Sequence, residues 1–206
     1  MTDSEPRAAD EIDRSVRARL EGGDLDGAAS LVIAHYGPEL YGFLCAVARD
    51  DDLASDAFAA ASEHLWRYLP KFRWDASLRT WAYQLARHAL YHLRAAPSRR
   101  PERNLPLSIA PSIEAVVRSR TAPHQRTEIK EGVRALRDAL DPEDHELLIL
   151  RLDRNMSWKD IARSLAGVDE QADIDQRAAS LRKRYERVKT QLRELAIERG
   201  LLPEPD

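Results

Sequence analysis

The stretch from residue 71 to residue 94 interleaves cations with aromatic side chains. It contains five basic residues, five aromatic residues and a single acid. Cations hold phosphates, and aromatic faces stack on bases that have left a duplex, at about 1–3 kcal/mol per stacked base. We therefore predict that this stretch binds unpaired nucleic acid through ten residues: Lys71, Phe72, Arg73, Trp74, Arg79, Trp81, Tyr83, Arg87, Tyr91 and Arg94.

Two interpretations of these side chains stay open. On a helix, Arg79, Tyr83, Arg87 and Tyr91 recur every four residues and form a stripe beside the apolar one. Alternatively, the arginines only solvate a helix and the aromatic residues belong to the core, as Trp81 would between Leu78 and Leu85.

A second basic group lies on the last helix that the periodicity predicts, over residues 175–199. Its cations lie off the apolar face, and the helix follows two short capped helices, as in a helix-turn-helix whose last helix reads the major groove. A solvated amphipathic helix or a short coiled coil is the alternative. The candidate duplex-binding residues are Arg177, Arg182, Lys183, Arg184 and Arg187.

The charges are segregated along the chain. Net charge is −8 over residues 1–70, +8 over 71–140, −6 over 141–175 and +3 over 176–206. Such blocks either neutralise one another inside the fold or form two surfaces that face a polyanion.

The elements that must position these residues are helices. Helical periodicity extends along nearly the whole chain, and no alternating β-branched stretch competes with it, which predicts an all-α protein. We predict breaks at Gly22-Gly23 and at Gly37-Pro38, a helix over 53–69 that ends before Pro70, and a helix over 77–95 capped by Ser77.

The second half begins its helices with acids and small polar residues. Asp141 precedes Pro142 at a first helical position, and Ser157 with Asp160 forms a partial capping box. Gly200 ends the last helix.

Prolines divide the chain into two domains. Five of the eleven prolines fall between residues 97 and 123, where they prevent a continuous helix. We predict domains over 1–96 and 125–206, joined by a linker over 97–124.

Several functional classes are excluded or disfavoured. Apolar runs are too short for a membrane span and the N-terminus is acidic, so we expect a cytoplasmic protein. The single cysteine, Cys45, excludes a disulfide framework. His88 and His92 are spaced to share a metal, but Ala89 stands where the catalytic glutamate of an HExxH site would be. With no phosphate-binding glycine loop and no nucleophile motif, we expect no cofactor, no metal and no catalysis.

In this order, the motifs resemble a bacterial RNA polymerase sigma factor of the extracytoplasmic-function type. LWRYLPKF followed by SLRTWAYQLAR (residues 65–72 and 77–87) is similar to sigma region two. VRAL, MSWKDIA and LRKRY (133–136, 156–162 and 181–185) are similar to sigma region four. A proline-rich spacer separates the two.

The resemblance implies a role for each part. The helix over 53–69 would dock on core RNA polymerase, with Asp56, Phe58, Glu63 and Trp66 making or supporting that contact. The loop over 70–76 and the helix after it would open the minus-ten promoter element, and the last helix would read the minus-thirty-five element. The implied partners are core RNA polymerase, promoter DNA and an anti-sigma factor.

Three departures from the family pattern stand out. Ala59-Ala60 replaces the usual Gln-Glu pair in the polymerase-facing helix. His88 stands where the family often has asparagine, and it joins the strand-binding residues on that ground; His92 replaces an aspartate. An acidic insertion over 167–179 displaces or lengthens the last helix.

Three other functions stay open. The first is a helix-turn-helix regulator that binds duplex DNA without polymerase. The second is a metal-dependent enzyme using His88 and His92. The third is a helical adaptor that binds only proteins.

Overall fold

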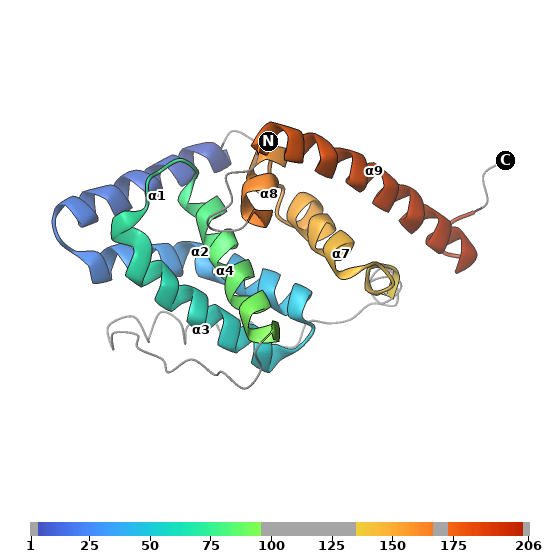
Figure 1. Ribbon diagram of the computed structural model, residues 1–206, viewed down its shortest axis with the longest axis horizontal. Helices are drawn as coiled ribbons and strands as arrows, with labels where there is room; N and C mark the ends of the chain where they lie inside the picture. The colour runs from blue at the N-terminus through green and yellow to red at the C-terminus, as the bar shows by residue number, and fades with distance from the viewer. Residues whose placement is uncertain (1–3, 96–134, 167–172, 204–206) are drawn as a thin grey trace. The chain divides into compact units, whose positions relative to one another are not determined.

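The structure, a computed structural model, describes residues 4–95, 135–166 and 173–203. All regular elements in these ranges are helical and no strand occurs among them, which confirms the all-α prediction (Figure 1). Two compact units emerge: residues 4–95 with 163–166, and residues 135–162 with 173–203. The predicted linker over 97–124 lies outside the described residues, so the predicted domain boundaries stay predictions.

The first unit is a bundle of four helices. They are α1 (Ser4–Glu21), α2 (Leu25–Ala48), α3 (Asp51–Tyr68) and α4 (Leu78–Ala95), with a 3-10 turn η1 (Leu69–Lys71) after α3. α2, α3 and α4 pack against one another, and α1 packs on α2. The largest side chains that this core buries completely or nearly so include Phe43, Leu44, Phe58, Leu78, Tyr83 and Leu90.

The turn between α1 and α2 follows the sequence prediction. Gly23 has φ +78°, a conformation that favours glycine, and Asp24 caps α2 by accepting from the backbone N–H of Gly27 at 2.9 Å. That hydrogen bond and the one from Arg19 lower the pKa of Asp24. A Cβ on Gly27 would lie 2.0 Å from Asp24 Oδ2, so the cap leaves no room for a side chain there.

The predicted break at Gly37-Pro38 is wrong, because α2 continues through both residues. Proline removes one backbone donor and costs a helix interior about 3 kcal/mol. Pro38 is exposed and so is Ala34, whose carbonyl loses its partner, so water can supply that hydrogen bond. Buried side chains on both sides of the proline, Ile33 and Leu44 among them, stabilise the continuous helix by a larger amount.

α2 is also the helix in the described ranges that is long and apolar enough to cross a membrane. More than half of its apolar window, 56%, is buried inside the protein. Its composition therefore reflects a central position in the bundle.

The second unit contains α7 (Pro142–Leu148), a π-helical turn η2 (Ile149–Asp153), the start of α8 (Trp158–Leu165) and α9 (Ile174–Glu198). α7 begins with Pro142 as predicted, but the Asp141 side chain makes no capping hydrogen bond. At α8, Ser157 Oγ accepts from the N–H of Asp160 at 3.2 Å, as predicted. The reciprocal contact differs, because the Ser157 hydroxyl donates to the Asp160 carboxylate.

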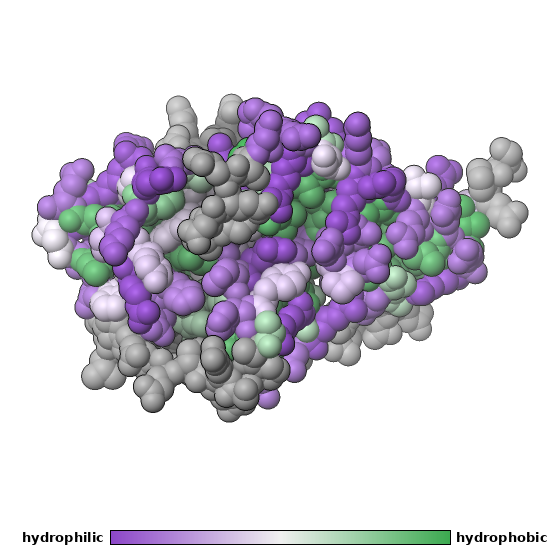
Figure 2. All heavy atoms as spheres, viewed as in Figure 1, coloured by the Kyte–Doolittle hydropathy of each residue, from purple (hydrophilic) through white to green (hydrophobic). Residues whose placement is uncertain are grey.

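α9 begins inside the predicted insertion, at Ile174, later than a tight helix-turn-helix connection after Leu165 would place it. Asp173 accepts from the backbone N–H groups of Asp175 and Gln176, so part of the predicted insertion lengthens this helix. The helix ends before Gly200, which has φ +69°. Its buried face comprises Ala178, Tyr185, Val188 and Ala196. On the face that Figure 2 shows, hydrophilic side chains cover much of the described surface.

Candidate nucleic-acid interface

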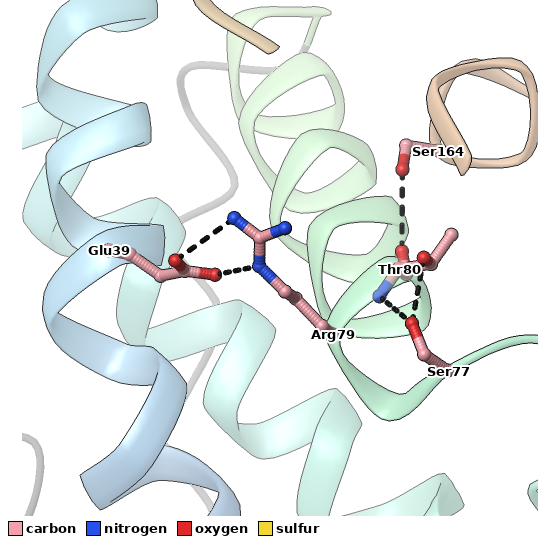
Figure 3. A network of polar contacts seen from close by, with 5 residues as sticks. All are labelled: Glu39, Ser77, Arg79, Thr80 and Ser164. Atoms are coloured by element: carbon pink, nitrogen blue, oxygen red, sulfur yellow. Dashed lines mark hydrogen bonds and ion pairs between the residues drawn. The ribbon is translucent and has the colours of Figure 1, made fainter. Parts of the chain in front are cut away.

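The candidate interface in the first unit is the loop that joins α3 to α4. Pro70 occupies an early position of η1, where its missing donor is not needed, and Phe72 continues in an extended conformation. Ser77 starts α4: its Oγ accepts from the N–H of Thr80 at 3.1 Å and lies 2.9 Å from the Thr80 hydroxyl (Figure 3). Residues 72–76 are therefore held at both ends.

Three rings from this loop and α4 are in contact, and we call them the aromatic cluster: Phe72, Trp74 and Trp81. The rings of Phe72 and Trp81 are stacked, with centroids 4.7 Å apart and planes inclined by 22°, whereas those of Phe72 and Trp74 are tilted by 55° with centroids 4.9 Å apart. All three side chains are half-buried. The rings thus keep part of their surface in solvent, which a closed core would not allow.

Two cations flank the aromatic cluster in exposed positions. Lys71 and Arg73 are both exposed, and Arg73 forms a solvent-exposed ion pair with Asp75 at 3.0 Å. An ion pair this exposed contributes little to stability, so Arg73 can exchange its carboxylate for a phosphate at small cost.

The four-residue stripe on α4 is corrected at one position. Tyr83 has no exposed surface, and its ring packs edge-on against Phe43 with centroids 5.2 Å apart. The stripe runs beside the apolar face, and the small neighbours Ala82 and Ala86 leave room for the ring to turn inward. Tyr83 therefore belongs to the core of the bundle.

The arginines of α4 bind within the bundle. Arg79 makes a bidentate ion pair with Glu39 of α2, with Nε–Oε1 at 2.7 Å and Nη2–Oε2 at 3.2 Å (Figure 3). Arg94 donates to the carbonyl of Val47 at 2.7 Å and so satisfies the end of α2. The Arg87 guanidinium lies 4.5 Å from the centre of the half-buried Tyr91 ring. The contacts of Arg79 and Arg94 tie α4 to α2, whereas the contact of Arg87 with Tyr91 lies within α4.

Two more polar contacts join α4 to residues 163–166. Ser164, at the end of α8, donates to the carbonyl of Thr80 at 3.5 Å (Figure 3), and Gln84 donates to the carbonyl of Ala166 at 3.2 Å. Residues 163–166 belong to the same compact unit as α4.

Three histidines line up across α3 and α4. The ring centroids of His64 and His88 are 6.2 Å apart, as are those of His88 and His92. Burial lowers the pKa of His64, and the charge of His88 lowers it further. Within the described ranges no group of three histidine, cysteine or acidic side chains could hold a metal ion.

The candidate polymerase-facing residues of α3 divide into two kinds. Phe58 is buried against Tyr41, so it can support a polymerase contact only by packing beneath the surface residues of α3. Glu63 is mostly buried and accepts from Arg67 at 2.6 Å. Two members reach the surface: Asp56 and Trp66 are half-buried, and the Trp66 indole N–H donates to Asp26 of α2 at 2.8 Å.

The cations of α9 also divide into those that bind other side chains and those that reach the surface. Arg184 binds Glu143 and Asp144 of α7. Burial disfavours its charged form, but the hydrogen bonds that Arg184 donates to Asp144 and Glu143 outweigh that effect and raise the pKa of Arg184.

The other cations of α9 lie at varied depths. The Arg182 guanidinium lies 5.8 Å from the centre of the Trp158 ring, which also packs on Tyr185. Arg177 is half-buried, whereas Lys183 and Arg187 are exposed.

Sequence reasoning missed the partners that lie on α1 and α2. Arg17 lies over Trp74 with its guanidinium carbon 4.0 Å from the ring centre, and Glu39 holds Arg79. These contacts join residues 40 or more positions apart, which local spacing does not reveal. The signal that could have indicated a paired role for Glu39 is that it is a single carboxylate in the apolar stretch of α2.

Comparison with known proteins identifies part of the chain. Residues 32–100, about a third of the sequence, match the family described as Sigma-70 region 2. The match begins within α2 and includes α3, the aromatic cluster and α4. No curated protein matches the chain. This match supports a sigma factor of the sigma-70 family.

The match also decides between classes of function. A sigma-70 region 2 domain binds core RNA polymerase and promoter DNA, and sigma-70 proteins are non-catalytic initiation factors. The protein is thus not an enzyme, and the metal-dependent alternative is set aside.

Proposed function

We propose that the protein is a sigma factor of the extracytoplasmic-function type, which joins core RNA polymerase and opens promoters with its first unit. The observation that carries this proposal is the aromatic cluster of Phe72, Trp74 and Trp81, half-exposed between two exposed cations inside the region 2 match. Stacked rings hold unpaired bases while cations hold the backbone.

The exposure of each side chain indicates which residues would contact the separated strand. Lys71 and Arg73 would contact phosphates, and the aromatic cluster would receive a base. Arg79 and Arg94 would act mainly by fixing α4, since Glu39 and the end of α2 bind them. Arg87 would border the strand beside Tyr91, on which its guanidinium packs. His88 and Tyr91 would border the same strand at the surface of α4.

The second unit would read duplex DNA at the minus-thirty-five element. Its two short helices followed by the long α9 support this assignment, as do the exposed Lys183 and Arg187. Arg177 would contribute from the first turns of α9. Arg182 and Arg184 would chiefly hold α9 on its neighbours.

The polymerase contact would lie on α3. Asp56 and Trp66 present surface there, while Glu63 and Phe58 support them from inside. Binding to polymerase places the protein in the cytoplasm. An anti-sigma partner follows from the family resemblance alone.

Transcription in vitro tests this proposal. Core RNA polymerase and the purified protein, on a genomic promoter library, should give discrete start sites that core enzyme alone does not give. Permanganate should show reactive thymines upstream of those starts. The double variant Lys71→Ala/Arg73→Ala should lose thymine reactivity, whereas the matched variant Arg14→Ala/Arg49→Ala should keep it.

Two outcomes would favour other functions. Duplex binding without start-site selection or co-purification with polymerase would indicate a regulator. Absence of any salt-dependent affinity for nucleic acid would indicate a protein-binding adaptor.

A further inference from the structure

Arg17 of α1 covers the outermost ring of the aromatic cluster. Its guanidinium carbon lies 4.0 Å from the centre of the Trp74 ring, and Trp74 contacts Phe72, which stacks on Trp81. The order of contacts is therefore Arg17, Trp74, Phe72 and Trp81, and only the last two rings are stacked. The ring face that Arg17 covers is one that a nucleobase could use.

The backbone of Trp74 is strained. It has φ +62°, in the left-handed region that favours glycine and is a rare conformation for a bulky residue. Such strain persists only where surrounding contacts hold it, and it concentrates in segments that change conformation. The Trp74 ring contacts Arg17 and Phe72.

α1 has no other role in the proposed interface. Residues 4–21 precede the region 2 match, which begins at residue 32. Arg17 is exposed and sits on the surface of the bundle, so it can move away from Trp74 without opening the core.

We propose that Arg17 is a latch: it occupies the Trp74 face in the unbound protein, and an unpaired nucleobase takes its place when strands separate. The exchange replaces a cation–π contact with base stacking and lets residue 74 leave its strained conformation. The latch rests on the proposed strand-binding function, and it adds α1 as a part that sets the affinity for single strands.

The latch predicts a change in DNA affinity opposite to the one that simple electrostatics predicts. Removing a cation near DNA normally weakens binding, since each phosphate contact contributes counterion release. Removing Arg17 should instead strengthen binding, because the competitor for the ring face is gone. The contact is worth enough for a gain of about two- to fivefold in affinity.

The test measures binding of a fluorescent single-stranded oligodeoxynucleotide to the full chain by anisotropy. Arg17→Gln should bind about two- to fivefold more tightly than wild type. Arg14→Gln, which removes the same charge from the same helix, should bind equally or more weakly. Arg17→Lys keeps a cation over the ring and should stay close to wild type.

A double-mutant cycle ties the effect to Trp74. Trp74→Gly removes the ring and suits the left-handed backbone, so it should fold normally and bind single strands more weakly. On that background, Arg17→Gln should give no gain. The four tryptophan indole N–H signals in a 15N NMR spectrum provide a second readout, in which Arg17→Gln and added oligonucleotide should both shift the Trp74 signal.

The outcomes separate the latch from the function on which it rests. If Arg17→Gln binds no more tightly than wild type while Trp81→Ala loses binding and transcription, the latch is wrong and the interface stands. If Arg17→Gln still gains affinity in the Trp74→Gly background, the latch is also wrong. If Trp81→Ala leaves both binding and transcription unchanged, the strand-binding function itself fails.

Discussion

At the scale of single residues, charged side chains divide into those that bind partners inside the protein and those that face solvent. Arg79, Arg94 and Arg184 each bind groups on another helix, whereas Lys71 and Arg187 are exposed. A substitution in the first set should change stability before it changes DNA binding. A substitution in the second set should do the reverse.

Arg184→Ala tests the first set. Loss of the two contacts to Glu143 and Asp144 should lower the free energy of unfolding by about 1 kcal/mol, a modest value because the group is partly exposed to water. Urea denaturation followed by circular dichroism measures it. Arg187→Ala is the control, with unchanged stability and weaker duplex binding; equal stability of both variants would contradict the assignment.

His64 should make stability depend on pH. Its pKa in the folded protein lies below the ordinary 6.5 because of burial and the neighbouring His88. As pH falls through 6.5, the unfolded chain binds a proton before the folded one, so stability is lost toward acid.

The measurement is the free energy of unfolding on both sides of pH 6.5. His64→Gln should flatten the pH dependence. An identical slope in wild type and His64→Gln would count against this assignment.

At the scale of elements, α2 shows tertiary packing overriding a local signal. Neighbouring helices bury residues of α2 both before and after Pro38, a proline that alone would end the helix. Pro38 therefore destabilises α2 at an exposed position where another residue would not.

Pro38→Ala should consequently stabilise the protein. The substitution restores the hydrogen bond to the Ala34 carbonyl, and the loss of proline's constraint on the unfolded chain offsets about 1 kcal/mol. We expect a net gain of about 2 kcal/mol in the free energy of unfolding. Pro142→Ala, at the first position of α7 where proline is favourable, should give no gain.

At the scale of the whole molecule, the alternating charge blocks pair with one another in part. The ion pairs Glu39–Arg79 and Asp144–Arg184 each join an acidic block to a basic one. The cations that remain exposed should determine how duplex affinity depends on salt.

The double variant Lys183→Ala/Arg187→Ala should reduce the slope of log affinity against log salt by about 1.8, if each side chain neutralises one phosphate. Titration of a labelled duplex at several salt concentrations measures the slope. Arg199→Ala, beyond the end of α9, should leave it unchanged.

Helix ends and apolar faces could be predicted from the sequence because they depend on neighbours in the chain. Gly23, Ser77 and Gly200 act at the predicted boundaries. The direction in which Tyr83 points could not be predicted, since the space beside Ala82 and Ala86 exists only once α2 is packed. The contact of Arg17 with Trp74 likewise depends on how the bundle closes.

The bidentate pair of Arg79 with Glu39 has a mechanical consequence. Together with Arg94 at the other end of α4, it fastens both ends of that helix to α2. If residues 72–76 bind a separated strand, as proposed, α4 would stay fixed to α2 under the pull of the DNA. The loop would then be the part that changes conformation.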